Sequence, residues 1–137
     1  MRSIAHISDL HFGREDPEIA EALLKDLQSF QPSLVIVSGD LTQRASKVQF
    51  KAAASYLKRI PFPLFIVPGN HDIPLYNVLR RFISPLRQYK KHISPDVGPL
   101  FNDGKIAVVG INTAKSLAIK NGRISKKQIS LLTESIT

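Results

Sequence analysis

Six polar side chains stand just after short apolar runs of the sequence. They fall into three groups whose first members, Asp9, Asp40 and Asn70, are separated by 31 and 30 residues. The full set is Asp9, His11, Asp40, Asn70, His71 and Asp72. Carboxylate, imidazole and amide groups are ligands that divalent metal ions take from proteins when no thiolate is present. The spacing and the residue types therefore predict a metal site.

Four of these residues have the chemistry of metal ligands. Asp9 and His11 are two apart in what we expect to be an extended loop, so both can turn toward one ion. The two oxygens of Asp40 can bridge a pair of ions. Asn70 offers a neutral carbonyl oxygen, which suits a position where another carboxylate would add too much negative charge.

The other two residues, His71 and Asp72, are suited to proton transfer. A histidine held by an acidic neighbour can donate a proton or contact a phosphate group. Taken singly, an Asp or Asn after a strand is more often a turn residue that hydrogen-bonds nearby backbone, but six such residues together favour the site. His6 is instead predicted to be a hydrogen-bonded interior histidine, and His92 a solvent-facing one.

The apolar runs predict strands of a parallel sheet. Residues 34–37 and 64–67 are short, uninterrupted and rich in branched side chains, which is typical of strands covered on both faces. Residues 4–8 form the first such run. Ligands of open parallel sheets bind at the carboxyl ends of the strands, and the six polar residues lie there.

Helical patterns separate the runs. Asp16 is expected to cap the first helix, with Pro17 in its first turn. Its apolar stripe, at 3.6-residue spacing, comprises Ile19, Leu23, Leu24, Leu27 and Phe30. Ser46 is expected to cap the second helix, with Gln49 three places on. Strands alternating with helices predict consecutive right-handed βαβ units in a layered α/β fold.

The pattern is less regular beyond Asp72. Four further elements are expected: helix 75–82, loop 90–99, strand 105–111 and helix 125–134. The strand is predicted to form a hairpin with residues 100–101 through Asn102-Asp103-Gly104. A length of 137 residues suits a single domain.

The amino-acid composition excludes some kinds of chemistry and favours some partners over others. The absence of cysteine excludes disulfides, thiolate metal sites and a cysteine nucleophile. The net charge is +8, and residues 80–137 carry eleven basic and three acidic side chains, against eight of each in residues 1–79. Phosphate-rich partners would be attracted to that half, although nucleic acid is not favoured because aromatic residues are not interleaved at stacking intervals. With no signal-like or membrane-spanning segment, we expect a cytoplasmic protein without a membrane partner.

The sequence blocks Asp9-Leu10-His11, Gly39-Asp40 and Gly69-Asn70-His71-Asp72 resemble the ordered D-x-H, G-D and G-N-H-[DE] blocks of the calcineurin-like metallophosphoesterase superfamily. As a set these blocks are specific. A weaker similarity to the bacterial cyclic-nucleotide phosphodiesterases lies in HISDLHFG, in residues 106–113 and in residues 122–128. The resemblance spans nearly the whole chain and about the first half of a usual family domain.

The resemblance implies both a fold and a function. The fold would be the N-terminal portion of a four-layer α/β/β/α sandwich. The function would be metal-dependent hydrolysis of a phosphoester, a phosphodiester or phosphomonoester, with two divalent ions (Mn, Fe or Zn) and a metal-bound hydroxide as nucleophile. A cyclic nucleotide is one substrate that the resemblance suggests; a nuclease of the same superfamily is another possibility.

The matching positions assign a role to each residue by resemblance. His71 would contact the scissile phosphate or the leaving oxygen, with Asp72 orienting it. The metal ligands would be Asp9 and His11 at the first ion, Asp40 between the two ions and Asn70 at the second.

The sequence also departs from the family pattern. Members place another histidine after the next strand and close with a G-H-x-H block, whereas this chain has no histidine after His92. The second metal site is then left with Asp40 and Asn70. We therefore expect a C-terminally truncated domain over residues 1–137, with apolar sheet surface uncovered and available for self-association. The alternative is a non-catalytic remnant that binds phosphate-bearing partners through its basic second half.

Overall fold

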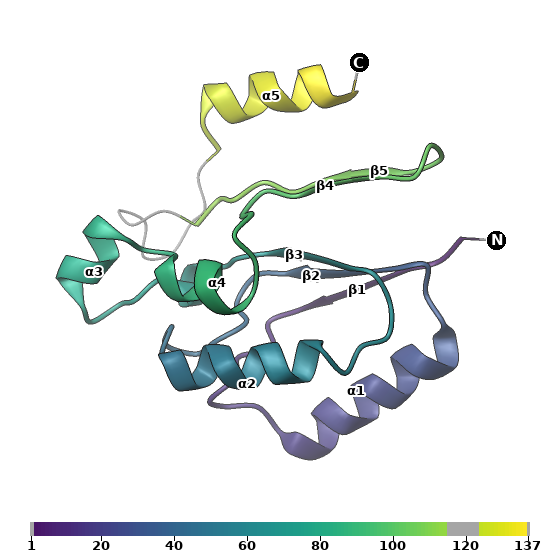
Figure 1. Ribbon diagram of the computed structural model, residues 1–137, viewed down its shortest axis with the longest axis horizontal. Coiled ribbons are helices and arrows are strands. Elements are labelled where there is room, and N and C mark those ends of the chain that lie inside the picture. The colour runs from purple at the N-terminus through teal and green to yellow at the C-terminus, as the bar shows by residue number, and fades with distance from the viewer. Residues whose placement is uncertain (1, 115–123, 137) are drawn as a thin grey trace.

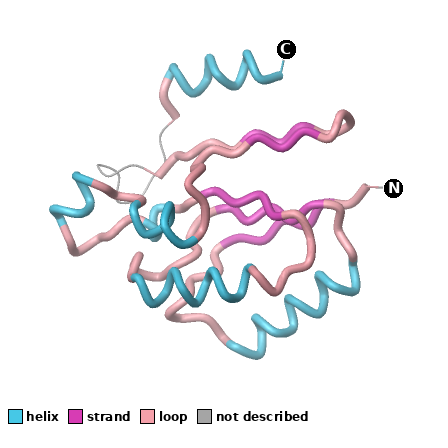
Figure 2. The backbone as a smooth tube through the Cα atoms, in the orientation of Figure 1, coloured by secondary structure: helices cyan, strands magenta, loops and turns pink. Residues whose placement is uncertain are grey.

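The secondary-structure elements stack in four layers (Figure 1). Residues 2–114 and 124–136 are described by the computed structural model. Helices α1 and α2 form one outer layer, a parallel sheet and a β-hairpin form two inner layers, and α5 lies on the far side of the hairpin (Figure 2). The elements in chain order are β1 (Ile4–Ser8), α1 (Pro17–Phe30), β2 (Leu34–Ser38), α2 (Lys47–Leu57), β3 (Leu64–Val67), the 3₁₀ turn η1 (Asn70–Asp72), α3 (Val78–Ile83), α4 (Arg87–His92), β4 (Leu100–Asn102), β5 (Ala107–Val109) and α5 (Lys126–Ile136). The predicted α/β fold, the N-terminal portion of an α/β/β/α sandwich, is confirmed.

The parallel sheet has the strand order β1-β2-β3. Ser8 at the end of β1 pairs with Ser38 at the end of β2, and Ser38 pairs with Val67 at the end of β3. The three carboxyl ends therefore lie at one edge, because the register aligns them without a stagger. This alignment places the loops that follow the strands beside one another.

Both predicted helix caps are present. The Asp16 carboxylate accepts hydrogen bonds from the backbone N–H groups of Glu18 and Ile19, at 2.9 and 3.3 Å. The Ser46 hydroxyl accepts from the N–H of Gln49 at 3.2 Å. These side chains satisfy N–H groups that a helix leaves unpaired in its first turn, so the starts of α1 and α2 are set by local sequence.

The core lies between α1, α2 and the sheet. Val35, Val37 and Phe50 are completely buried there. The predicted stripe of α1 is wrong at its two ends, since Ile19 and Phe30 are 68% and 61% exposed. The buried residues of the helix are Leu24 and Leu27.

Three other expectations need correction. His6 is exposed and not interior, because β1 is an edge strand. The predicted hydrogen bonding is present, since its Nε2 atom lies 2.6 Å from the Ser38 hydroxyl. Helix α4 occupies the beginning of the expected loop 90–99, anchored by Tyr89, which is fully buried and donates a hydrogen bond to the Ile66 carbonyl at 3.0 Å. His92 is only partly exposed, and its Nε2 atom is buried.

The expected hairpin is present, and Gly110, directly after it, approaches β3. β4 and β5 are antiparallel, and β5 is shorter than the predicted strand. A Cβ atom at Gly110 would come within 2.8 Å of the Val67 side chain, so the absence of a side chain there permits the close approach. Residues 122 and 123 of the motif 122–128 lie outside the described residues. No described helix is long and apolar enough to span a bilayer.

We predict that Phe50→Ala lowers the free energy of unfolding by about 3–5 kcal/mol, because it leaves a cavity beneath the sheet. Phe30→Ala is the matched control on the exposed end of α1 and should change stability by less than about 0.5 kcal/mol. Urea denaturation followed by circular dichroism measures both. Equal effects would show that the core is not placed as described.

Candidate metal centre

The loops after β1 and β2 continue to pair beyond the strands. The His11 N–H donates to the Asp40 carbonyl and the Phe12 N–H to the Leu41 carbonyl, each at 2.9 Å. The Gln43 N–H in turn donates to the Phe12 carbonyl at 3.0 Å. These bonds hold the D-x-H and G-D blocks in fixed register at the sheet edge.

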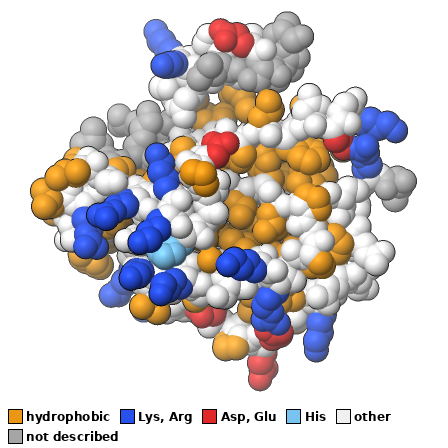
Figure 3. Space-filling model, in the orientation of Figure 1, with side chains coloured by type: hydrophobic (Ala, Val, Ile, Leu, Met, Phe, Trp, Pro, Cys, Tyr) orange, Lys and Arg blue, Asp and Glu red, His pale blue; other side chains and the backbone are white. Residues whose placement is uncertain are grey.

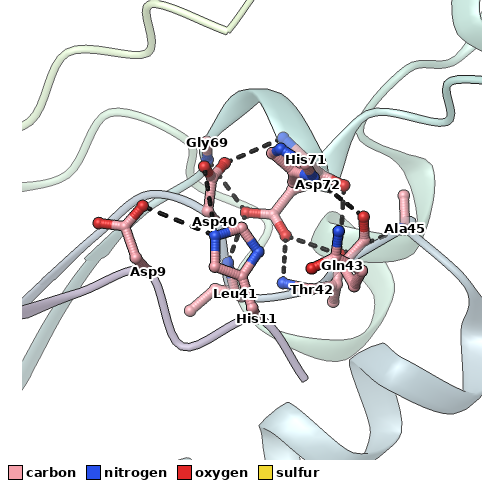
Figure 4. Close-up of polar contacts among 10 residues, drawn as sticks. All are labelled: Asp9, His11, Asp40, Leu41, Thr42, Gln43, Ala45, Gly69, His71 and Asp72. Atoms are coloured by element: carbon pink, nitrogen blue, oxygen red, sulfur yellow. Dashed lines mark hydrogen bonds and ion pairs between the residues drawn. The ribbon is translucent and has the colours of Figure 1, made fainter. Parts of the chain in front are cut away.

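Three of the predicted ligands converge there. Asp9, His11 and Asp40 each offer a ligand atom, and these atoms lie within 4.8 Å of one another (Figure 4). The His11 Nε2 atom is 3.7 Å from the Asp9 carboxylate and 4.0 Å from the Asp40 carboxylate. Two carboxylates and one imidazole at this separation make a concentrated negative site that suits a divalent cation.

The backbone of all three converging residues is left-handed, although the loop carrying Asp9 and His11 was predicted to be extended. The φ angles are +56° at Asp9, +44° at His11 and +45° at Asp40. Residues other than glycine seldom adopt this region, and Asp and His are among those found there most often. Such strain persists only where the surroundings impose it, and it concentrates at functional sites.

The surroundings of the two ring nitrogens of His11 are a further test of whether a cation fits. Its Nδ1 atom is buried and has no hydrogen-bond partner among the described residues. Its other ring nitrogen faces two carboxylates. A cation held between that nitrogen and the carboxylates would neutralise their repulsion, so this donor set fits a metal ion.

The third loop, after β3, contacts the Asp40 carboxylate from the opposite side. The His71 N–H donates to Asp40 Oδ1 at 2.9 Å, which leaves Oδ2 facing His11. A Cβ atom at Gly69 would overlap both the Oδ1 atom and the backbone nitrogen of Asp40. Glycine at position 69 is therefore required for the two loops to meet.

The His71 ring lies beside the converging ligands. Its centroid is 4.9 Å from that of His11, with the two rings nearly perpendicular at 87°. Its Nδ1 atom is 3.0 Å from the Gln43 carbonyl. Because a carbonyl only accepts, Nδ1 carries the proton, and Nε2 is left as the group that reacts or binds. The contact with Gln43 was not predictable from the sequence, because it uses a main-chain oxygen that every residue carries.

Asp72 lies behind the site, with its side chain turned to backbone rather than to the His71 ring. It is 1% exposed, and its carboxylate accepts from the N–H groups of Leu41, Thr42 and Gly69 at 3.2, 2.9 and 3.0 Å, and from the Thr42 hydroxyl at 2.9 Å. Burial raises the pKa of Asp72, and these hydrogen bonds oppose the rise. The direct contact by which Asp72 was expected to orient His71 is not found among the described residues. Asp72 instead joins the loop that carries His71 to the loop after β2.

Asn70 opens the 3₁₀ turn η1 and is exposed. Together with Gln43, Arg44, His71 and Tyr76 it lines a pocket of about 300 Å³ next to the converging ligands. Its place as a ligand of a second ion stays a prediction.

Comparison with known proteins agrees with this geometry. The family profile described as calcineurin-like phosphoesterase matches residues 2–134, and the chain belongs to that family. A glycerophosphodiester phosphodiesterase, GpdQ, of Enterobacter lignolyticus is 30% identical over 81 residues, which is 50% of this chain and 29% of that protein. The probable cyclic nucleotide phosphodiesterase of a Synechococcus strain is 30% identical over 82 residues, 53% of this chain and 32% of its own. One from a Pseudoalteromonas strain is 36% identical over 80 residues, 50% of this chain and 31% of its own.

These matches cover only part of each relative, which limits what can be concluded from them about this chain. The chain spans about a third of the length of the curated relatives it matches. They therefore support the family assignment, while the activity and the substrate of this chain have to be proposed.

We predict that Asp72→Asn destabilises the protein by about 1–3 kcal/mol, because the amide NH₂ group would face backbone N–H groups and leave them buried without an acceptor. Asp26→Asn, on the exposed side of α1, is the control and should be nearly neutral. Urea denaturation gives both values. Equal stability of the two variants would contradict the bracing role of Asp72.

Proposed function

We propose that the protein hydrolyses phosphoesters at a dinuclear metal centre. Asp9 and His11 hold the first ion, Asp40 is shared, and Asn70 serves the second. The observation that carries this proposal is the convergence of Asp9, His11 and Asp40 at the sheet edge on strained left-handed backbone.

The side chains around the ligands have separate tasks in this proposal. His71 presents Nε2 to the phosphoryl group or the leaving oxygen, since its Nδ1 atom is bound to the Gln43 carbonyl. The buried Asp72 carboxylate is a positioning group, which fixes the loop carrying Asp40 to the loop carrying His71. The pocket lined by Asn70 and His71 receives the organic part of the ester.

Divalent ions, when bound, would supply a Lewis acid and a site for an activated water molecule. The oxygen and nitrogen donors suit manganese, iron or zinc. Asp40 and Asn70 are the donors that we assign to the second ion, and that pair alone makes it the weaker site. We accordingly expect slow hydrolysis by the isolated chain.

The names of the relatives supply the candidate substrates. They are described as glycerophosphodiester and probable cyclic nucleotide phosphodiesterases. Both names describe phosphodiesters, so we propose a phosphodiester, with a cyclic nucleotide among the first to be assayed.

We predict that the chain hydrolyses a generic aryl phosphodiester when Mn²⁺ is added and that Asp40→Ala reduces the rate to the buffer background. Removal of Asp40 takes away the carboxylate that the two ions would share. Asp26→Ala is the matched control, and its rate should equal that of the unaltered chain. If the unaltered chain and Asp40→Ala retain the same rate, the enzymatic proposal is wrong.

Metal binding can be tested apart from turnover. We predict that His11→Gln weakens Mn²⁺ binding, measured by calorimetry, by at least about tenfold because it removes a ligand. His6→Gln, on the edge strand, should leave the affinity unchanged, since His6 bonds to Ser38 and not to the site. An equal loss in both variants would point to a general loss of structure.

A further inference from the structure

A set of large apolar side chains is exposed on one segment outside the metal centre. They belong to residues 75–83, which include helix α3, and their exposed fractions lie between 45% and 75%. The residues are Leu75, Tyr76, Val78, Leu79, Phe82 and Ile83. We call this surface the α3 face. Side chains exposed singly are ordinary, whereas a contiguous set of this size marks a contact surface.

Basic side chains surround the α3 face. Residues 75–92 contain five basic and no acidic side chains, and four of the five, all but Arg81, are exposed. In Figure 3 the hydrophobic side chains at the α3 end of the molecule adjoin a concentration of Lys and Arg side chains over α4. The lysines of α2 extend this basic region, because α2 packs on α4. Burial lowers the pKa of His92, and the charges of Lys91, Lys51 and Lys47 lower it further.

Apolar and cationic groups meet directly in the hollow beneath the α3 face. A pocket of about 320 Å³ has Leu79 and Ile83 on its walls, together with Arg44, Arg80 and Arg87. The Arg44 guanidinium also lies over the Tyr76 ring, 5.7 Å from its centroid. A partner for this surface must therefore accept aliphatic side chains and supply negative charge in the same place.

We propose that the α3 face is an interfacial contact that binds the surface of an anionic phospholipid bilayer. Apolar side chains would enter the boundary between headgroups and acyl chains, while the surrounding Arg and Lys side chains pair with lipid phosphates. This contact needs no membrane-spanning segment, so it differs from the sequence-based expectation of no membrane partner, which considered only such segments. It does not depend on the proposed hydrolase activity.

Other occupants fit the charge and apolar character less well. A second copy of this chain would bring an equally basic surface against this one, and like charges would repel. Nucleic acid would satisfy the charge but would leave exposed aliphatic groups facing phosphates and water, because most side chains of the face cannot stack on bases. A bilayer supplies both acyl chains and phosphate.

The α3 face adjoins the candidate metal centre, so docking through this face would orient the site relative to the bilayer. Leu75 and Tyr76 belong to the face and also line the 300 Å³ pocket with Asn70 and His71. A protein docked through this face would hold that pocket beside the lipid headgroups.

The test is flotation of the full chain with vesicles of phosphatidylcholine alone and of phosphatidylcholine mixed with phosphatidylglycerol. We expect binding to the mixed vesicles only, weakening as salt is raised. Phe82→Ser should reduce binding by about tenfold through lost apolar burial. Phe30→Ser is the matched control, since Phe30 is a similarly exposed phenylalanine on α1, and it should leave binding unchanged.

A pair of charge variants tests the electrostatic part. Arg80→Gln combined with Arg87→Gln should weaken binding by at least about tenfold, whereas Lys25→Gln combined with Lys58→Gln removes the same charge elsewhere and should have a small effect. Circular dichroism checks that each variant is folded.

Three results would overturn the proposal. One is an absence of binding to the mixed vesicles. Another is binding that Phe82→Ser and Phe30→Ser reduce equally. The third is a dimer in size-exclusion chromatography that Phe82→Ser dissociates while the unaltered chain ignores vesicles, which would assign the face to a second copy. Metal binding by the same preparations, measured independently, separates failure of this proposal from failure of the metal centre.

Discussion

The buried carboxylate of Asp72 is the interaction on which the arrangement of the site depends. It accepts hydrogen bonds from Leu41 and Thr42 in the loop after β2, and from Gly69 in the loop after β3. Backbone N–H groups at a sheet edge have no strand to pair with, and an unpaired buried group is costly. One carboxylate satisfies three of them and so fixes two loops at once.

That constraint lets the ligand residues keep an unfavourable backbone. Asp9, His11 and Asp40 have left-handed backbone, and their ligand atoms lie within 4.8 Å of one another. Hydrogen bonds across the loops hold them in place, at 2.9 Å from His11 to Asp40 and from His71 to the Asp40 carboxylate. Rigid positioning of negative charge is what a cation site requires, since the repulsion is already overcome when the protein folds.

The tertiary structure gathers acidic side chains on one surface and basic side chains on a neighbouring one. The carboxylates of Asp9 and Asp40 gather at the sheet edge, while the basic side chains of α4 and the lysines of α2 gather beside α3. The two surfaces adjoin at the pocket lined by His71 and Tyr76.

The sequence by itself determined the three strands, the caps at Asp16 and Ser46, and the six polar residues that follow the strands, because these signals depend on residues close together in the chain. Only the tertiary structure decided that Ile19 is exposed and that the Gln43 carbonyl holds His71. It also assigned Asp72 to backbone N–H groups and built α4 around the buried Tyr89. Those outcomes depend on strand register and on contacts between residues that are far apart in the sequence. Local residue type therefore does not determine them.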